Sequence, residues 1–464
     1  MGLVAAIGTD LDAFQESIAD LFTCFGYETT CWRLSEIIRE DSDLQKSKTL
    51  RDSPESARVE SFMDGGNELR ERTQFPEWLA LRAITKATSR RPDQGIPRAN
   101  NAYVFRSLKR PEEVDLFRQT YEGGFHLIGV YAGEDCRLRN LVQRGMTEAQ
   151  AKDLIRRDQE ETSPFGQRTR KTFHLADAFV RFESREDTRD LARVIRLIFG
   201  HQYTTPTPDE HAMFIAFGSS LRSADLSRQV GAVVSDANGD IIAVGANDVP
   251  CFGGGLYWPG NDKRDHALGY DSNDHRRGQI VDQIAGDLNL SAEQRRLLCS
   301  GPISDITEYG RTVHAEMEAL LSCARTGRTP RDGTLYTTVY PCHNCARHIV
   351  AAGIRRVVYV EPYPKSRALE LHFDAITHSG ESGKVSFEPF VGVGPRRFFD
   401  FFSMTLSSGY SFKDLSHARE RDGRTRPPNK ELRVKMRPTS YLDREKVLVS
   451  RVGVRIAELK KEGT

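Results

Sequence analysis

Two short stretches decide the architecture of the second half of this chain: His314-Ala315-Glu316 and Pro341-Cys342-His343-Asn344-Cys345. The two cysteines stand three positions apart where a helix over 342–352 is expected to begin, so both sulfur atoms can face one point. Helix starts favour thiolates, and His314, on the preceding expected helix, supplies a third donor. Zinc binds Cys and His, and three protein ligands leave one coordination position for water. The two stretches therefore predict one catalytic zinc ion per chain, held by His314, Cys342 and Cys345.

Glu316 is the predicted catalytic residue of this site. It lies two positions after His314, close enough to reach a water on the metal without being a ligand itself. A carboxylate there can take the proton of the water, protonate N3 of a pyrimidine and later protonate departing ammonia. The pattern H-x-E followed by P-C-x-x-C is the signature of zinc-dependent nucleobase deaminases. The alternative is a structural zinc or plain core cysteines, although neither His343 nor His348 has the spacing expected of a fourth ligand.

Around these stretches the second half alternates helices and strands. The turn signal Asn238-Gly239 joins two expected strands into a hairpin. A connection over 248–311, opened by Gly253-Gly254-Gly255, is long enough to be functional or to be ordered by a partner. We expect helices over 209–223, 314–323 and 342–352, and strands over 231–235, 241–246, 334–338 and 357–360.

The first half alternates short apolar strands with amphipathic helices. Such alternation predicts a parallel sheet covered on both faces, in a domain of the α/β class. The polar stretch 39–67 is expected to be a loop or a mobile helix, and the run Thr204-Thr205-Pro206-Thr207-Pro208 marks the domain boundary. The expected strands are 2–7, 102–106, 125–131 and 178–182, and the expected helices are 10–24, 111–121 and 146–161.

Length and charge narrow the class of protein. A chain of 464 residues suggests two or three domains. Lys and Arg number 66 against 65 Asp and Glu, which argues against a nucleic-acid coat or a membrane-surface binder. No apolar run approaches the about 18 residues of a membrane span, no secretory signal is expected, and eight cysteines are too few for a disulfide scaffold. A reducing, cytoplasmic location is therefore expected.

The N-terminal run Gly2-Leu3-Val4-Ala5-Ala6-Ile7-Gly8-Thr9-Asp10 occupies the place of a phosphate-binding loop, between a strand and a helix. It lacks the lysine of that motif, because Thr9 and Asp10 follow the last glycine. Phosphoryl transfer is therefore not expected. Gly8, Thr9 and Asp10 are weak candidates for nucleotide contacts, and a scaffold used for docking or sensing is the alternative that we favour.

Residues 205–400 resemble the cytidine and deoxycytidylate deaminase superfamily. Beyond the metal motif, the resemblance rests on the runs Arg228-Gln229-Val230-Gly231-Ala232-Val233-Val234 and Gly245-Ala246-Asn247-Asp248-Val249-Pro250. It implies that Asn247 contacts the sugar and base of the substrate and that the Ala315 N–H holds the pyrimidine carbonyl. The alternative for Asn247 is a turn residue after a strand.

Five further positions are candidate substrate contacts. Tyr340, directly before Pro341, is expected either to pack on the base or to belong to the core at a strand end. Arg228 and Lys365 are candidate cations for the substrate phosphates, as are Lys263 and Arg264. The alternative for each of these cations is an ordinary surface charge.

Residues 1–185 resemble nucleotide-kinase-like P-loop domains through Tyr27, Arg33-Leu34-Ser35, the Arg137 to Arg144 segment and Arg156-Arg157-Asp158. The whole chain resembles the bacterial antiphage dCTP deaminases. This resemblance implies a kinase-like parallel-sheet domain over 1–190, an α/β/α deaminase domain over 205–410 and a basic extension over 411–464. The residues that favour this family are Gly8-Thr9-Asp10-Leu11-Asp12, Gly253-Gly254-Gly255-Leu256-Tyr257-Trp258, Asp271-Ser272-Asn273-Asp274 and Gly392-Val393-Gly394-Pro395-Arg396-Arg397.

The resemblance also implies an activity and partners. Such an enzyme converts dCTP and dCMP to uracil nucleotides and ammonia, which drains the dCTP that a phage needs. Homo-oligomers and a regulatory nucleotide are implied by analogy with deoxycytidylate deaminases, and an inhibitory RNA by the antiphage systems.

Three alternatives to this function stay open. They are a tRNA-type base deaminase, a housekeeping dCMP deaminase for dTTP synthesis and a regulator that is not an enzyme. The long connection before His314 suits a closed pocket, whereas the stretch 416–464, with 14 Lys and Arg against 7 Asp and Glu, keeps contact with RNA open. A second zinc on Cys251, His266 and His275 is a further hypothesis, less favoured than core or surface placement.

Overall fold

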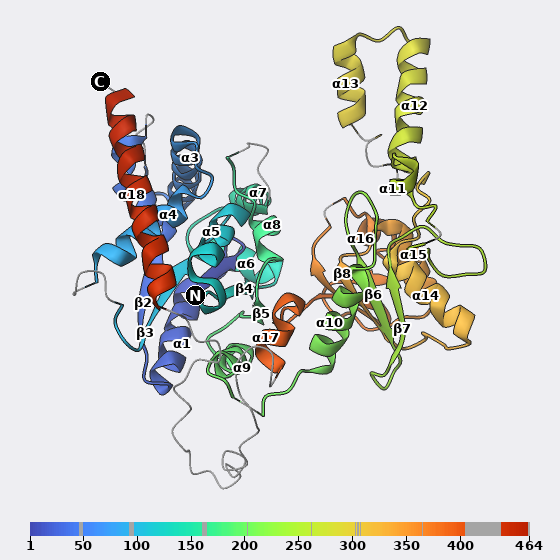
Figure 1. Cartoon of the computed structure of the whole chain (residues 1–464), viewed down its shortest axis with the longest axis horizontal. Helices are drawn as coiled ribbons and strands as arrows, with labels where there is room; N and C mark the ends of the chain where they lie inside the picture. The colour runs from blue at the N-terminus through green and yellow to red at the C-terminus, as the bar shows by residue number, and fades with distance from the viewer. Residues whose placement is uncertain are drawn as a thin grey trace. The chain divides into compact units, whose positions relative to one another are not determined.

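The computed structural model describes residues 1–464 except 46–49, 92–96, 160–164, 202, 261, 302, 304–305, 307, 364, 404–437 and 463–464. The chain forms two compact units (Figure 1). Residues 1–206 and 391–464 make the first unit, and residues 207–390 make the second. The first change of unit therefore falls inside the run Thr204–Pro208. The second unit ends at Phe390, before the expected end of the deaminase domain at residue 410, because the chain returns to the first unit there.

The second unit is built on a sheet with the strand order β10-β11-β9-β8-β6-β7. The pairs β6·β7 and β6·β8 are antiparallel, and the remaining pairs are parallel. The hairpin expected around Asn238-Gly239 is present as β6 and β7. The strands are β6 (Gly231–Ser235), β7 (Ile241–Ala246), β8 (Thr334–Val339), β9 (Arg356–Glu361), β10 (Ile376–Thr377) and β11 (Val385–Pro389).

Helices cover both faces of this sheet at close range. A side chain at Gly231 would collide with the backbone of α10 (Pro208–Ser220), and one at Gly245 with the backbone of α14 (Ala315–Thr326). Gly245 pairs with Ala232, the neighbour of Gly231, so the two glycines point to opposite faces. α10 and α14 therefore lie on opposite sides of the sheet. α15 (His343–Ala351) packs beside α14, and α16 (Ala368–Leu371) packs beside α15.

The long connection in the second unit folds into α11 (Asp265–Leu268), α12 (Ser272–Asp287) and α13 (Ala292–Ser300). α12 and α13 lie side by side and extend away from the sheet of their unit (Figure 1). Two arginine–carboxylate pairs tie the base of the connection. Arg264 lies 3.2 Å from Asp248, and Arg311 lies 2.9 Å from Asp265.

The first unit contains the expected parallel sheet, with the strand order β12-β5-β4-β1-β3-β2. Its first five strands in the chain run parallel, and β12 pairs antiparallel with β5. The strands are β1 (Gly2–Ala5), β2 (Glu28–Arg33), β3 (Asn101–Arg106), β4 (Leu127–Tyr131), β5 (Ala178–Arg181) and β12 (Gly392–Val393). Its larger helices are α1 (Leu11–Cys24), α2 (Leu34–Glu40), α3 (Glu55–Thr73), α4 (Trp78–Ser89), α5 (Pro111–Tyr121), α6 (Glu134–Gln143), α7 (Glu148–Gln159), α9 (Arg189–Ile198) and α18 (Pro438–Glu462).

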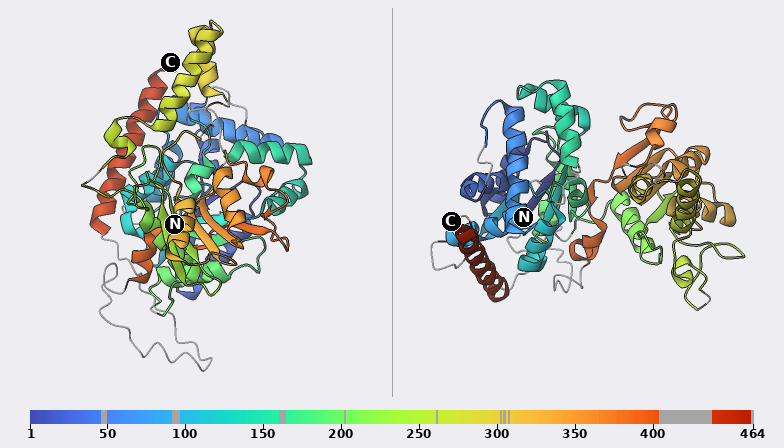
Figure 2. Two further views of the ribbon diagram at one scale, coloured as in Figure 1. Left: turned by 90° about the vertical axis from the view of Figure 1, so that its right-hand side faces the viewer. Right: turned by 90° about the horizontal axis from the view of Figure 1, so that it is seen from above.

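The C-terminal helix α18 belongs to the first unit and packs against α4 and α5, along the outside of that unit (Figure 2). Glu445 accepts two hydrogen bonds from the Arg91 guanidinium, at 2.6 and 2.7 Å, and one from the Tyr121 hydroxyl at 2.8 Å. Both charged side chains are buried. Residues 404–437, which carry much of the expected basic extension, lie outside the described residues.

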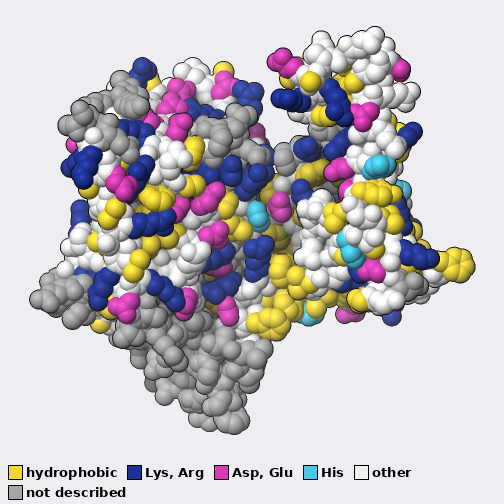
Figure 3. All heavy atoms as spheres, turned by 45° about the horizontal axis from the view of Figure 1, so that its top comes forward, with side chains coloured by type: hydrophobic (Ala, Val, Ile, Leu, Met, Phe, Trp, Pro, Cys, Tyr) yellow, Lys and Arg dark blue, Asp and Glu magenta, His cyan; other side chains and the backbone are white. Residues whose placement is uncertain are grey.

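The polar stretch 39–67 contains the end of α2, a 3-10 helix over Ser42–Leu44 and, from Glu55 onward, the first part of α3, while residues 46–49 lie outside the described part. Lys and Arg are interspersed with Asp and Glu over the face of the molecule in Figure 3, in line with their near-equal numbers. Among the described residues, no helix is both long and apolar enough to cross a membrane.

Candidate metal centre and active site

Two helix starts bring the predicted metal ligands together. His314 is the residue on which α14 begins, and it follows the bridge between Asp248 and Val313 at the end of the long connection. Cys342 is the corresponding residue of α15, separated from the end of β8 by Tyr340 and Pro341, and its sulfur accepts a hydrogen bond from the Cys345 N–H at 3.4 Å. The local spacing therefore places both sulfurs on the first turn of one helix, opposite the imidazole at the start of another.

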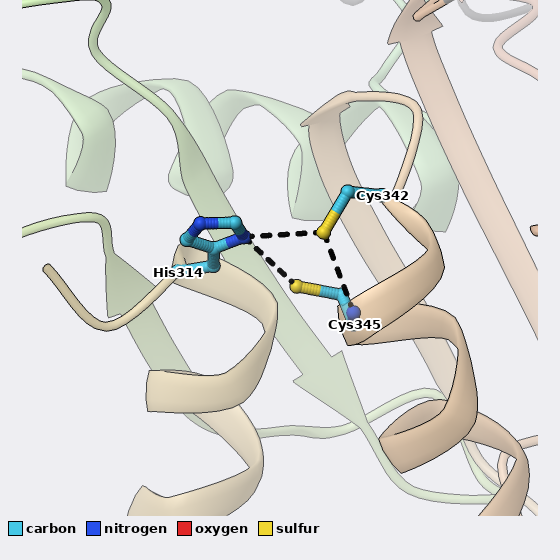
Figure 4. A group of neighbouring side chains, drawn as sticks. All are labelled: His314, Cys342 and Cys345. Carbon is cyan, nitrogen blue, oxygen red and sulfur yellow. Dashed lines mark hydrogen bonds between the residues drawn. The ribbon is translucent and has the colours of Figure 1, made fainter. Parts of the chain in front are cut away.

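The three donor atoms face one another (Figure 4). Nδ1 of His314 lies 3.3 Å from the sulfur of Cys342 and 3.3 Å from the sulfur of Cys345. All three donor atoms lie within 4.8 Å of one another. Tetrahedral zinc with its ordinary bond lengths separates such ligand atoms by about 3.5 Å. The residues present therefore fit a zinc ion.

The electrostatics of the site favour a thiolate at Cys342, next to which the pKa of the Cys345 thiol is raised. Hydrogen bonds from Cys345 and His314 lower the pKa of the Cys342 thiol to about 4. The hydrogen bond to Cys342 raises the pKa of His314 to about 9. A thiolate is thus stabilised where a metal ligand must be deprotonated.

Glu316 lies in the first turn of α14, beside these ligands. Glu316 is 4% exposed, and its Oε2 lies 3.5 Å from the Cys345 sulfur, which donates to it. Burial raises the pKa of Glu316 to about 7. A buried carboxyl beside the ligand set, but outside it, is placed for proton transfer.

Asn247 is buried directly after β7 and holds the backbone before β6. Its Oδ1 accepts from the Val230 N–H at 2.6 Å, and its Nδ2 donates to the Arg228 carbonyl at 2.9 Å. Ala315 is the first residue of α14, where backbone N–H groups have no acceptor inside the helix. This position of Ala315 is thus compatible with the predicted hydrogen bond from its N–H to a pyrimidine carbonyl. The side-chain amide of Asn247, in contrast, is already hydrogen-bonded to the backbone of Val230 and Arg228.

Tyr340 lies in the core of the second unit, which was one of its two expected placements. It is buried, its ring packs edge-on against Tyr359 at 4.8 Å, and its hydroxyl lies 3.1 Å from Nε2 of His378. Burial raises the pKa of Tyr340 to about 12. Tyr340 therefore supports the strand end that leads to Pro341.

The candidate phosphate-binding cations differ in their surroundings. The Arg228 guanidinium lies 5.3 Å from the centre of the Tyr363 ring and 3.8 Å from Glu361, and it is half-exposed. Lys365 is exposed on the segment that follows. Arg264 is buried and bonds to Asp248 and Asp262, so its charge is paired within the long connection. Lys263 is exposed.

Sequence reasoning missed Asp225. Its Oδ1 accepts from the backbone N–H groups of Ser227 and Arg228, and its Oδ2 accepts from the Thr312 hydroxyl at 3.0 Å. It therefore joins the segment that carries Arg228 to the segment that leads into His314. The run Asp225-Leu226-Ser227 is a signal for such an aspartate turn.

The residues expected for a second zinc site, Cys251, His266 and His275, do not form a ligand cluster in the described structure. Among the described residues, His314, Cys342 and Cys345 are the one group of three or more ligand side chains close enough to share an ion. The sulfur of Cys251 donates to the Gly254 carbonyl, His266 lies 3.3 Å from Asp262, and the His275 ring lies against Tyr270. These three candidate ligands therefore have separate surroundings.

The N-terminal candidates lie in the loop after β1. The Gly8 carbonyl accepts from Nδ2 of Asn140, Thr9 is buried, and the Asp10 side chain accepts from the Ala13 N–H at the start of α1. Asp10 therefore acts as the N-cap of this helix.

Comparison with known proteins agrees with the site. The family model for the cytidine and deoxycytidylate deaminase zinc-binding region matches residues 206–361. The deoxycytidylate deaminase of Enterobacteria phage T4 is 31% identical over 157 residues, which cover 33% of this chain and 77% of that protein. The human deoxycytidylate deaminase is 26% identical over 153 residues, 32% of this chain and 63% of the relative. The dCMP deaminase of cyanophage S-TIM5, solved with dCMP and dUMP, aligns over 40% of this chain and 98% of its own, at 20% identity and a TM-score of 0.26. The predictions of a deaminase-like domain in the second half and of a zinc cofactor are confirmed.

Proposed function

Because the chain belongs to the cytidine and deoxycytidylate deaminase family, we propose that it hydrolyses a deoxycytidine nucleotide, dCTP or dCMP, to the uracil nucleotide and ammonia. The observation that carries this proposal is the position of the buried Glu316 carboxyl beside His314, Cys342 and Cys345. When zinc is held by these three ligands, it supplies the Lewis acidity that brings the pKa of a coordinated water near neutrality.

Glu316 moves the protons of the reaction. Its carboxylate accepts a proton as water adds its oxygen to C4 of cytosine, and the carboxylic acid then protonates N3 of the ring. In the second step the Glu316 carboxylate takes the proton of the new hydroxyl group on C4 and passes it to the amino group, which leaves as ammonia, so that cytosine plus water gives uracil plus ammonia. The first-turn N–H of Ala315 is assigned to the pyrimidine carbonyl, which keeps C4 turned toward Glu316.

Recognition of the nucleotide is assigned to the segment before β6. Arg228 extends its guanidinium from this segment and is the proposed contact to the 5′ phosphates, with Lys365 as a second cation. Asn247 fixes the carbonyl of Arg228 and is proposed to contact the sugar at the same place. Tyr340 is proposed to support the base from the core.

The biological setting proposed for this activity is the depletion of dCTP during phage infection, by resemblance to antiphage dCTP deaminases. In that setting the first unit is a degenerate kinase-like P-loop domain, a proposal supported by its strand order β2-β3-β1-β4-β5. A homo-oligomer, a regulatory nucleotide and an inhibitory RNA are the proposed partners.

The second candidate function is that of a housekeeping dCMP deaminase, because relatives that match this part of the chain are named deoxycytidylate deaminases. A tRNA-type base deaminase is not favoured. The phage T4 and human proteins that match this part of the chain are named deoxycytidylate deaminases, after a nucleotide substrate.

Incubating the purified chain with equal amounts of dCTP, dCMP, deoxycytidine and an anticodon stem-loop RNA tests this function. We expect mass spectrometry to find dUTP or dUMP with unchanged RNA. Arg228→Ala should raise KM for the nucleotides and leave that for deoxycytidine unchanged. Inosine or uracil in the RNA, with unchanged nucleotides, would contradict the proposal.

A further inference from the structure

The loop over residues 6–10 in the first unit lies where parallel α/β sheets bind ligands. It follows β1 at the carboxyl end of the strand, and β1 stands between β3 and β4, where the strand order reverses. Crevices at such reversal points, outside the carboxyl ends of the strands, are the usual ligand positions. α1 begins directly after the loop, and the N-terminus of a 14-residue helix attracts anions.

An anionic side chain already occupies this loop. The Asp158 carboxylate, from the end of α7, is 1% exposed. Its Oδ2 accepts from the backbone N–H of Ile7 at 2.8 Å. Its Oδ1 accepts from the Lys109 ammonium at 2.7 Å and from the Thr169 hydroxyl at 3.1 Å. A loop N–H, an ammonium and a hydroxyl therefore converge on one carboxylate.

Lys109 supplies the cation that the sequence of the loop lacks. It follows β3, and its ammonium also donates to the Ala5 carbonyl at 2.8 Å, which fixes it beside the end of β1. Backbone N–H, ammonium and hydroxyl groups are also the donors that bind phosphate oxygens. The Asp158 carboxylate thus takes the position that a phosphate group would take.

Two further features show that the loop is polar beyond its contact with Asp158. The hydroxyl of Thr9 is buried and has no hydrogen-bond partner among the described residues. The buried Arg137 side chain lies against the loop, with its guanidinium 3.5 Å from the Ile7 carbonyl. A polar group buried without a partner costs free energy, so it points to a ligand that completes the loop.

We propose that the loop after β1 is an anion site whose internal ligand is Asp158, and that a phosphate group binds there only by displacing this carboxylate. The phosphate belongs either to a nucleotide or to free inorganic phosphate. In the wild-type chain the displacement breaks three hydrogen bonds of Asp158, so phosphate binds weakly. Without the carboxylate, the Ile7 N–H and Lys109 are released for the ligand.

Calorimetric titration of the full chain with inorganic phosphate, at constant ionic strength, tests the proposal. We expect Asp158→Ala to bind phosphate at least ten-fold more tightly than the wild type, and Lys109→Met to abolish the gain in the Asp158→Ala background. Asp153→Ala is the matched control, because Asp153 is an exposed aspartate on the same helix that pairs with Arg156. It should bind phosphate as the wild type does.

Asp158→Asn keeps the side-chain shape and removes the charge. If Asp158→Ala does not fold, this variant replaces it and should also bind phosphate at least ten-fold more tightly than the wild type. Repeating the titration with ATP separates the two sources, because tighter binding of ATP than of phosphate assigns the site to a nucleotide and equal binding assigns it to free phosphate. Equal phosphate affinities of the wild type and the folded Asp158 variant would overturn the proposal. The titration measures phosphate binding and does not need deaminase activity. A failure of the anion-site proposal can therefore be distinguished from a failure of the proposed function.

Discussion

Replacement of Glu316 by glutamine isolates the proton-transfer step from metal binding. The amide has the volume of the carboxyl and cannot accept a proton, while His314, Cys342 and Cys345 stay in place. General acid–base catalysis contributes about 100- to 10,000-fold to rates, so the variant should lose about 2.7 to 5.4 kcal/mol of transition-state stabilisation. The amide keeps the volume of the buried carboxyl and carries no charge, so the unfolding temperature of the variant should not fall below that of the wild type.

The assay follows ammonia release from dCTP or dCMP, with zinc measured in the same sample by emission spectroscopy. Glu318→Gln is the matched control, because Glu318 is equally buried on the same helix and bonds to Arg325 instead of the metal ligands. We expect kcat to fall only in Glu316→Gln, with one zinc per chain in both variants. If Glu316→Gln retained kcat within about three-fold, a factor well below the range for general acid–base catalysis, the assignment of Glu316 would be wrong.

Three other changes follow from the structure. Cys345→Ser should lower the zinc content well below one ion per chain, whereas His343→Ala should keep it; equal zinc in both, measured by emission spectroscopy, would contradict the ligand set. Glu445→Ala removes the carboxylate from a buried ion pair and should cost about 3–5 kcal/mol in denaturant unfolding, so a loss below about 1 kcal/mol would contradict the packing of α18. Burial opposes the ionisation of Asp209, but its hydrogen bonds with Arg356 outweigh this and hold the pKa of Asp209 below its ordinary value. Its stabilisation is therefore present above about pH 4 and lost as the pH falls through the lowered pKa, so unfolding curves of the wild type and Asp209→Asn should converge in acid; a constant difference would contradict this.

The metal site was predictable because its geometry is local. Two cysteines three positions apart at a helix start must share a face. His314 begins the preceding helix, α14, and it meets the cysteines because α14 and α15 pack side by side. The same holds for the hairpin at Asn238-Gly239, where the turn residues determine the pairing of β6 with β7.

Contacts between distant segments were not predictable from the sequence. Lys109 reaches the loop after β1 only because β3 pairs with β1, and the motif at that loop shows no lysine. Arg91 and Glu445 stand far apart in the chain, and neither lies in a pattern that indicates the other. Tyr340 had two placements that the sequence could not separate, because a strand end that leads to the metal ligands lies next to both the core and the site.

Zinc titration into the metal-free protein tests whether the chain is a zinc-dependent deaminase of deoxycytidine nucleotides. After removal of metal with a chelator, the chain is given increasing zinc, and conversion of dCTP and dCMP to uracil nucleotides is followed by mass spectrometry together with ammonia release. We expect no conversion without metal and a rise in rate that saturates at one zinc per chain. Conversion that continues in the metal-free protein, or zinc binding at this stoichiometry with no deamination of either nucleotide, would contradict it.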